Sequence, residues 1–82
     1  MDASMKLLEA MVDQRRKGLS EGDAAAPEAA REAGIEPGSS EYHAALEYLL
    51  TSGDMEPHPN ETLAAQGIYR ITPVGLARSR GG

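Results

Sequence analysis

The chain has 82 residues and a formal net charge of −5, and this length predicts one domain with a thin core, because such a domain buries only roughly 60–65% of the surface of its unfolded chain. It contains no cysteine, which excludes a disulfide scaffold and a cysteine-based zinc site. No segment has the about 18 apolar residues of a membrane span, and the N-terminal residues lack the pattern of a signal peptide, so we expect a soluble cytoplasmic protein without membrane contact.

The first predicted helix covers residues 3–17, with Asp2 or Ser4 as its N-cap. Its apolar positions recur with helical spacing: Met5, Leu7, Leu8, Met11 and Val12. Leu7 and Met11 lie beside the main row, and we expect them to be exposed. Because so small a core leaves apolar surface to bury, these two side chains are predicted to support a homodimer.

A short second helix is predicted over residues 26–34, after a connector at residues 19–23. Pro27 suits its first turn, where a missing N–H is tolerated, and Gly34 suits its end. Its alanines provide a small-residue face for close packing: Ala29, Ala30 and Ala33. Residues 36–38, Glu-Pro-Gly, are predicted to form a turn.

The third helix has the clearest amphipathic pattern in the chain. Ser39 and Ser40 are alternative N-caps, and Gly53 is expected at the C-terminal end. One apolar stripe recurs at helical spacing: Tyr42, Ala45, Leu46 and Leu49. This stripe is predicted to face the core.

Two short strands are predicted after the third helix, the first beginning at Met55 and the second covering residues 68–71. The loop between them, residues 57–67, contains two prolines. We expect residues 1–80 to form a single domain and residues 81–82 to be a frayed tail.

The second of these strands is predicted to alternate between the core and solvent. Tyr69 and Ile71 face the core, and Arg70 faces outward. Thr72 then caps a last helical turn, with Pro73 in its first position.

Two segments, separated by the long loop, carry a family resemblance. Residues 44–53 have the sequence Ala-Ala-Leu-Glu-Tyr-Leu-Leu-Thr-Ser-Gly, and residues 69–75 have the sequence Tyr-Arg-Ile-Thr-Pro-Val-Gly. Together they resemble the recognition helix and the returning wing strand of the winged helix-turn-helix family. The resemblance implies a mainly α, three-helix winged-helix domain with a small β-hairpin wing.

The resemblance also implies DNA binding of a transcription-regulator type, because the third helix of that family enters the major groove while the wing touches the backbone. The exposed face of the third helix would present Glu41, Ala44, Glu47, Tyr48 and Thr51. Arg, Lys, Asn and Gln, which pair best with guanine and adenine, are missing from this face, and residues 58–61 at the wing tip have no fixed cation. We therefore expect weak or non-specific contact with double-stranded DNA.

The residues assigned to that contact are Arg70, Arg78, Arg80, Tyr48 and Thr51. The acidic middle of the chain repels phosphate, so these C-terminal arginines would have to form a local basic strip. The alternative is that they lie on a solvated strand edge and tail.

The alternative function is that of an acidic winged helix acting as a protein-interaction or homodimerisation module without DNA binding, because fold alone does not fix function. The residues expected at such an interface are Leu7, Met11 and Tyr48. An exposed tyrosine favours this alternative, since tyrosine is common among the residues that dominate interface energetics.

No catalytic, metal or cofactor site is predicted. His43 and Glu47 are one helical turn apart, but zinc sites need three or four protein ligands, and the other histidine, His58, is expected in a loop. The sequence has no glycine-rich phosphate loop and no nucleophile motif. We therefore expect a protein that is not an enzyme.

Overall fold

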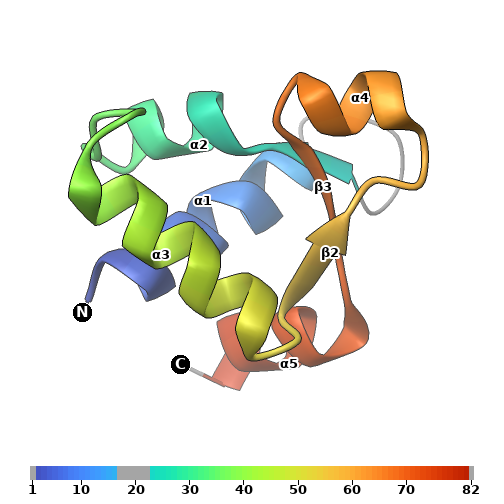
Figure 1. The fold of residues 1–82 in the computed structure, drawn as a ribbon. Coiled ribbons are helices and arrows are strands. Elements are labelled where there is room, and N and C mark those ends of the chain that lie inside the picture. The colour runs from blue at the N-terminus through green and yellow to red at the C-terminus, as the bar shows by residue number, and fades with distance from the viewer. Residues whose placement is uncertain (1, 17–22, 82) are drawn as a thin grey trace.

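A computed structural model describes residues 2–16 and 23–81 of the chain. This part contains helices and a small antiparallel sheet (Figure 1), which bears out the expectation of a largely helical chain with a small β element. In chain order the elements are α1 (Ala3–Arg16), β1 (Asp23–Ala25), α2 (Ala26–Glu32), α3 (Ser40–Thr51), β2 (Met55–Pro57), α4 (Glu61–Ala65), β3 (Ile68–Ile71) and α5 (Pro73–Gly81). Helix α5 thus reaches into the tail expected at residues 81–82, of which Gly82 lies outside the described residues.

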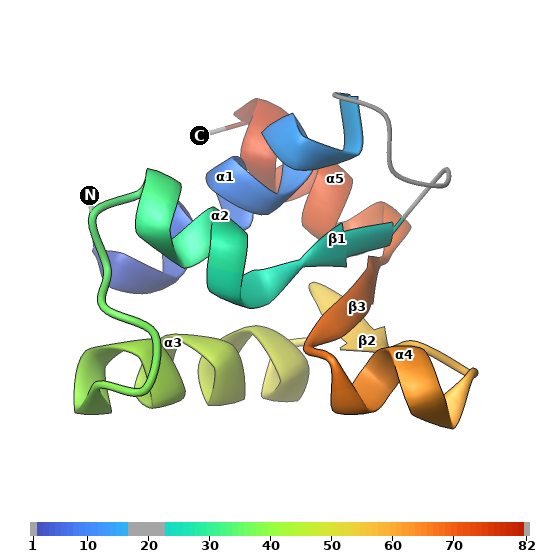
Figure 2. The ribbon, with the colours of Figure 1, turned by 90° about the horizontal axis from the view of Figure 1, so that it is seen from above.

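Helix α1 runs through the middle of the molecule. Figure 2 shows it between α5 on one side and α2 and α3 on the other. Its start is capped by Asp2, whose Oδ1 accepts hydrogen bonds from the Met5 amide at 3.0 Å and from the Ser4 hydroxyl at 2.7 Å. The expected capping role of Asp2 is confirmed.

Both apolar rows of α1 are buried. Leu7, Leu8 and Met11 have no exposed surface, so the prediction that Leu7 and Met11 are exposed and available to a homodimer is wrong. Because α1 is covered by α2, α3, β1 and α5, a single stripe of side chains does not suffice to contact all of its neighbours. The second row completes the core instead of forming an outer interface.

The sheet has the strand order β1–β3–β2, with both pairs antiparallel. Strand β1 lies where the sequence predicts the passage from a connector to the second helix, so this strand was missed. Its sequence, Asp-Ala-Ala, has none of the β-branched or aromatic residues typical of strands. Pairing with β3 and a hydrogen bond of 2.9 Å from the Ala25 amide to Gln14 Oε1 on α1 hold it in place.

Helix α2 confirms the predicted small-residue face at Ala29 and Ala30, but it ends two residues earlier than predicted, and Ala33 is its partly buried C-cap. Pro27 lies in its first turn, and Ala29 and Ala30 are fully buried. Gly34 ends it with a φ of +80°, and the amide of Ile35 donates to the carbonyl of Ala30 at 2.8 Å. The positive φ explains the glycine at this position.

Helix α3 begins after Ser39, whose side chain accepts a hydrogen bond of 3.1 Å from the Tyr42 amide. The predicted apolar stripe is confirmed as the buried face of this helix: Tyr42, Ala45, Leu46 and Leu49. The helix therefore lies against α1 (Figure 1) and turns its other side to solvent.

The sequence predicted a plain loop between β2 and β3. This prediction is wrong, because the segment contains α4. Asn60 caps this short helix: its Oδ1 accepts from the amides of Thr62 at 2.9 Å and Leu63 at 3.3 Å. An N-cap asparagine followed by Glu-Thr-Leu-Ala-Ala favours a helix, whereas the two prolines just before it favoured the loop interpretation.

The junction between β3 and α5 packs closely against the turn after α3. The Thr72 hydroxyl donates to the Gly53 carbonyl at 2.6 Å and accepts from the Gly75 amide at 3.2 Å. A Cβ atom on Gly75 would lie 2.1 Å from the carbonyl oxygen of Asp54. The expected capping role of Thr72 is therefore confirmed, and the lack of a side chain at Gly75 permits the close packing.

In the described ranges, 2–16 and 23–81, no helix combines the length and the apolar character that crossing a membrane requires.

Candidate functional site

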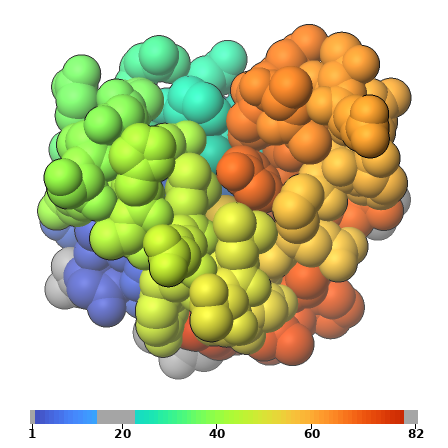
Figure 3. Space-filling model, in the orientation of Figure 1, coloured from blue at the N-terminus to red at the C-terminus, as the bar shows by residue number. Residues whose placement is uncertain are grey.

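The solvent side of α3 presents the residues expected from the sequence, and all of them are exposed: Glu41, Ala44, Glu47, Tyr48 and Thr51. His43 also lies on the exposed part of this helix, and Figure 3 shows α3 at the surface of the molecule. None of these side chains is a lysine, an arginine or an amide. Tyr48 is half exposed and is one of two large apolar side chains found at the surface of the described residues. Tyrosine is among the residue types that dominate interface energetics.

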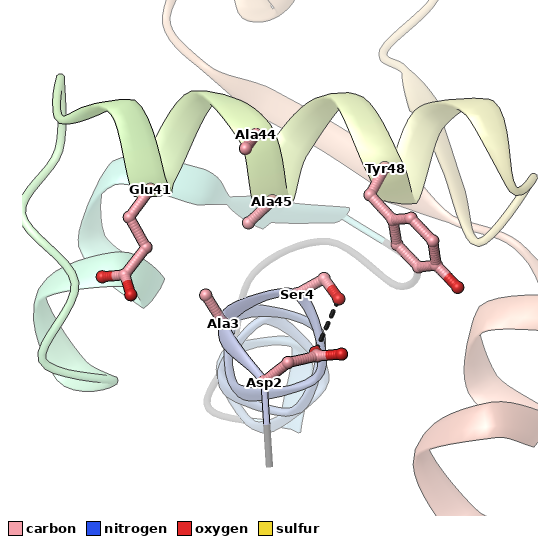
Figure 4. Close-up of a pocket in the computed structure, with 7 residues that line it drawn as sticks. All are labelled: Asp2, Ala3, Ser4, Glu41, Ala44, Ala45 and Tyr48. Carbon is pink, nitrogen blue, oxygen red and sulfur yellow. Dashed lines mark hydrogen bonds between the residues drawn. The ribbon is translucent and has the colours of Figure 1, made fainter.

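A shallow groove of about 260 Å³ lies between α3 and the start of α1. Figure 4 shows Glu41 and Tyr48 projecting from α3 on either side of Ala44 and Ala45, with α1 opposite them. The complete lining is Asp2, Ala3, Ser4, Glu41, Ala44, Ala45 and Tyr48. The groove is smaller than the roughly 300–1,000 Å³ of a small-molecule site.

Two carboxylates belong to the groove, Asp2 at the start of α1 and Glu41 in the first turn of α3. The hydrogen bond from the Met5 amide, and next the one from the Ser4 hydroxyl, lower the pKa of Asp2 below its ordinary value of 3.8. Asp2 is therefore a carboxylate at neutral pH. No lysine or arginine lines the groove, which makes its rim acidic.

Tyr48 is held from the side by α5. The guanidinium carbon of Arg78 lies 5.5 Å from the centre of the Tyr48 ring, within cation–π distance. The Tyr48 side chain is also the largest cause of a raised pKa of Arg78, with further contributions from Asp54. The ring of Tyr48 is thus held in place by a side chain of α5.

Arg78 also has a partner inside the protein. Its Nη1 lies 2.8 Å from Oδ2 of Asp54, a side chain with no exposed surface, and its Nη2 lies 3.2 Å from the sulfur of Met5. The Ser52 hydroxyl donates to the same Asp54 oxygen at 2.5 Å. The sequence missed this network, because the aspartate follows a turn glycine and nothing in its surroundings indicates burial.

The structure does not present the predicted basic strip as free cations. Arg78 is paired with Asp54, and Arg70, whose side chain is 44% exposed, lies 3.8 Å from Oδ1 of Asp23. The side chain of Arg80 lies outside the described residues. Two of the three arginines therefore already neutralise carboxylates of their own chain, which weakens their attraction for phosphate.

The turn that leads into α4 is fixed to the sheet by His58. Its Nε2 lies 3.3 Å from Oδ2 of Asp23 on β1, and its Nδ1 accepts from the Asn60 amide at 3.0 Å. Because Nδ1 is an acceptor, the ring proton belongs on Nε2, where it is donated to Asp23. This histidine, like the aspartate, is mostly buried, so the segment predicted as the wing tip is fastened to the sheet.

In the part of the chain that the structure describes, no group of three or more His, Cys, Asp or Glu side chains is placed to hold a metal ion. His43 and Glu47 therefore have no described third ligand with which to form a metal site.

Comparison of the chain with protein-family models, with curated proteins and with solved structures found no match. The features from which function can be inferred are therefore those of the molecule itself: the exposed face of α3, the acidic groove beside it and the positioned ring of Tyr48.

Proposed function

We propose that this chain is a winged-helix-type domain that binds another protein through the exposed face of α3, in place of DNA. The order of elements supports the winged-helix part of the proposal. Helices α1, α2 and α3 precede the β2–β3 pair, and the two segments that resemble the family, residues 44–53 and 69–75, lie on α3 and at the β3–α5 junction.

The observation that carries the functional part is the chemistry of the exposed face of α3. A helix that enters a major groove uses arginine, lysine, asparagine or glutamine to read bases, and this face offers Glu41 and Glu47 instead. Each carboxylate near a phosphate adds repulsion of about 1 kcal/mol at 4 Å even in water. The same face would therefore be repelled by the ligand that the family usually binds.

The surface near β2 and α4 supports the same conclusion. In place of an extended basic wing, the chain forms α4, whose first turn carries Glu61, and β2 exposes Glu56. His58 is turned inward to Asp23. Among the described residues, the segment 58–61 therefore has no lysine or arginine that could contact a phosphate.

Tyr48 favours a protein partner. Its ring combines a large apolar area with few rotatable bonds, and Arg78 already holds it in place. Small side chains beside it, Ala44 and Ala45, allow a partner to approach the helix closely. A fixed aromatic ring beside the apolar floor of a shallow groove is typical of an interface centre.

A DNA titration tests the exclusion of DNA. Fluorescence anisotropy with a random-sequence duplex at about 50 mM and about 200 mM salt is expected to show no saturable binding at micromolar protein, because few phosphates could be neutralised. Saturable binding of the duplex whose affinity is altered by Glu47→Ala or Arg70→Ala would show that this surface contacts DNA and would overturn the proposal.

Site-specific photo-crosslinking tests the protein-binding surface. A photoreactive residue in place of Ala44 on α3 is expected to give a discrete protein adduct in the cells that make this chain. The matched control replaces Ala65, an exposed alanine on α4. Adducts of equal yield from both positions, or from neither, would contradict the assignment to α3.

A further inference from the structure

We infer that the groove between α1 and α3 binds a segment of a partner protein in which an apolar side chain is flanked by lysine or arginine. This inference rests on the proposed function and specifies the chemistry of the partner. It follows from the shape of the groove, from the charges on its rim and from the way in which Tyr48 is held.

The shape selects an apolar side chain. Ala3, Ala44 and Ala45 line the groove without polar side-chain atoms, and Tyr48 stands beside them (Figure 4). A cavity of roughly 150 Å³ is enough to hold a group the size of benzene. The about 260 Å³ of the groove therefore accommodate one leucine- or phenylalanine-sized side chain together with part of its neighbour.

The charges select cationic flanking residues. Asp2 and Glu41 belong to opposite walls of the groove, one on α1 and the other on α3, so cations on both sides of an apolar anchor can each meet a carboxylate. Glu47 adds a further exposed carboxylate on α3. Opposite charges at an interface rim raise the rate of encounter and select against acidic partners.

The nearby cation of the protein does not cancel this preference. Arg78 borders Tyr48, but its Nη1 is paired at 2.8 Å with the fully buried Asp54. The charge of Arg78 is therefore largely taken up by Asp54, and its effect on Asp2 is the smallest of the causes that lower the pKa of that carboxyl group. Arg78 acts on the groove as a support for the tyrosine ring.

Nuclear magnetic resonance titration of the full chain with synthetic peptides tests the inference. The first peptide is an amphipathic leucine–lysine sequence of about 14 residues, long enough to form a helix on binding. A leucine–glutamate peptide and a serine–lysine peptide of the same pattern separate the need for cations from the need for an apolar anchor. Only the leucine–lysine peptide is expected to bind, with the largest amide shifts at Ala3, Ala44 and Tyr48.

Two glutamates provide a matched charge test, because Glu41 and Glu61 are both exposed in the first turn of a helix but only Glu41 lines the groove. Glu41→Lys is expected to weaken binding of the leucine–lysine peptide by about tenfold, and Glu61→Lys by less than about twofold. Equal weakening by both variants would show attraction by net charge alone and would overturn the inference.

Substitutions of Tyr48 test the apolar wall. Tyr48→Phe keeps the ring and is expected to bind the leucine–lysine peptide as the parent does, whereas Tyr48→Ser is expected to lose at least about fivefold in affinity. The far-ultraviolet circular dichroism of each variant checks that it is folded. Unchanged affinity in Tyr48→Ser would contradict the inference.

The remaining outcomes separate this inference from the proposed function. If Ala44 gives a specific crosslink but the leucine–lysine peptide does not shift groove resonances, the partner chemistry is wrong and the protein-binding function stands. If sedimentation shows self-association that Glu41→Lys abolishes, the occupant is a second copy of this chain, and the inference is overturned.

Discussion

Asp54 and Arg78, 24 residues apart in the sequence, form an ion pair of 2.8 Å in which the carboxylate has no exposed surface and the guanidinium reaches the protein surface. The pair joins the turn after α3 to helix α5. It also connects the interior to the proposed docking face, because the same guanidinium borders the ring of Tyr48.

Removing the cation of this pair is expected to destabilise the protein. Arg78→Met leaves Asp54 buried without its counter-charge, and we expect a clear loss in the free energy of unfolding, moderated by the 34% exposure of the arginine. Urea denaturation measures the loss. Arg70→Met, at a more exposed and longer ion pair, is the control and is expected to cost less than about 1 kcal/mol.

A double-mutant cycle compares the single variants Arg78→Met and Asp54→Asn with the variant that carries both changes. Since the uncompensated charge is then absent, the double variant is expected to be more stable than Arg78→Met alone. Strict additivity of the two single effects would refute the ion pair as their common cause.

The close approach at Gly75 predicts a steric effect. Gly75→Ala would ordinarily favour a helix, but its Cβ would lie 2.1 Å from a backbone oxygen, so we expect a loss of at least about 2 kcal/mol from overpacking. Thermal unfolding followed by circular dichroism measures it. Val74→Ala, at an exposed neighbouring position of α5, is the control and should change stability by less than about 0.5 kcal/mol.

The cap of α4 predicts a local effect. Asn60→Ala removes the acceptor of the Thr62 and Leu63 amides and is expected to cost about 1 kcal/mol. Hydrogen exchange should become faster at these amides and remain unchanged at the Tyr42 amide, which Ser39 caps. Faster exchange throughout the chain would point to global destabilisation instead.

The lowered pKa of Asp2 predicts a pH dependence. A carboxyl group whose pKa is lower in the folded state than in the unfolded state adds stability above its ordinary value of 3.8, and this stability is lost as the pH falls through the lower, folded-state value. Asp2→Asn removes the titration. The variant is therefore expected to be less stable than the parent at neutral pH, and the difference in melting temperature should shrink as the pH falls below 3.8. A difference that grows on acidification would contradict the assignment.

The elements that the sequence predicted well have strong local patterns. The stripe of α3, with an N-cap serine before it and a glycine after it, specifies both the helix and its buried face. In β3, Ile71 is buried and Arg70 exposed, as the alternation predicts. In these segments local preference and tertiary packing agree.

The features that the sequence did not predict depend on contacts between distant segments. Strand β1 exists through its pairing with β3, and the burial of Leu7 and Met11 depends on how many elements surround α1. The groove needs residues from the starts of α1 and α3. The spacing of residues within one segment carries no information about contacts between segments. For this reason Tyr48 was the one groove residue that the sequence assigned to an interface.

The hydrogen bond from the Ala25 amide to Gln14 has a consequence for the kinds of partner this protein can accept. Strand β1 is at one edge of the sheet, and an added strand would need the backbone donors of that edge. One of these is already taken by a side chain of α1, while Pro57 in the opposite edge strand, β2, has no amide hydrogen to offer. Both edges are thus poor templates for β-augmentation and for edge-to-edge aggregation, which leaves the helical surface as the part of the molecule suited to recognition.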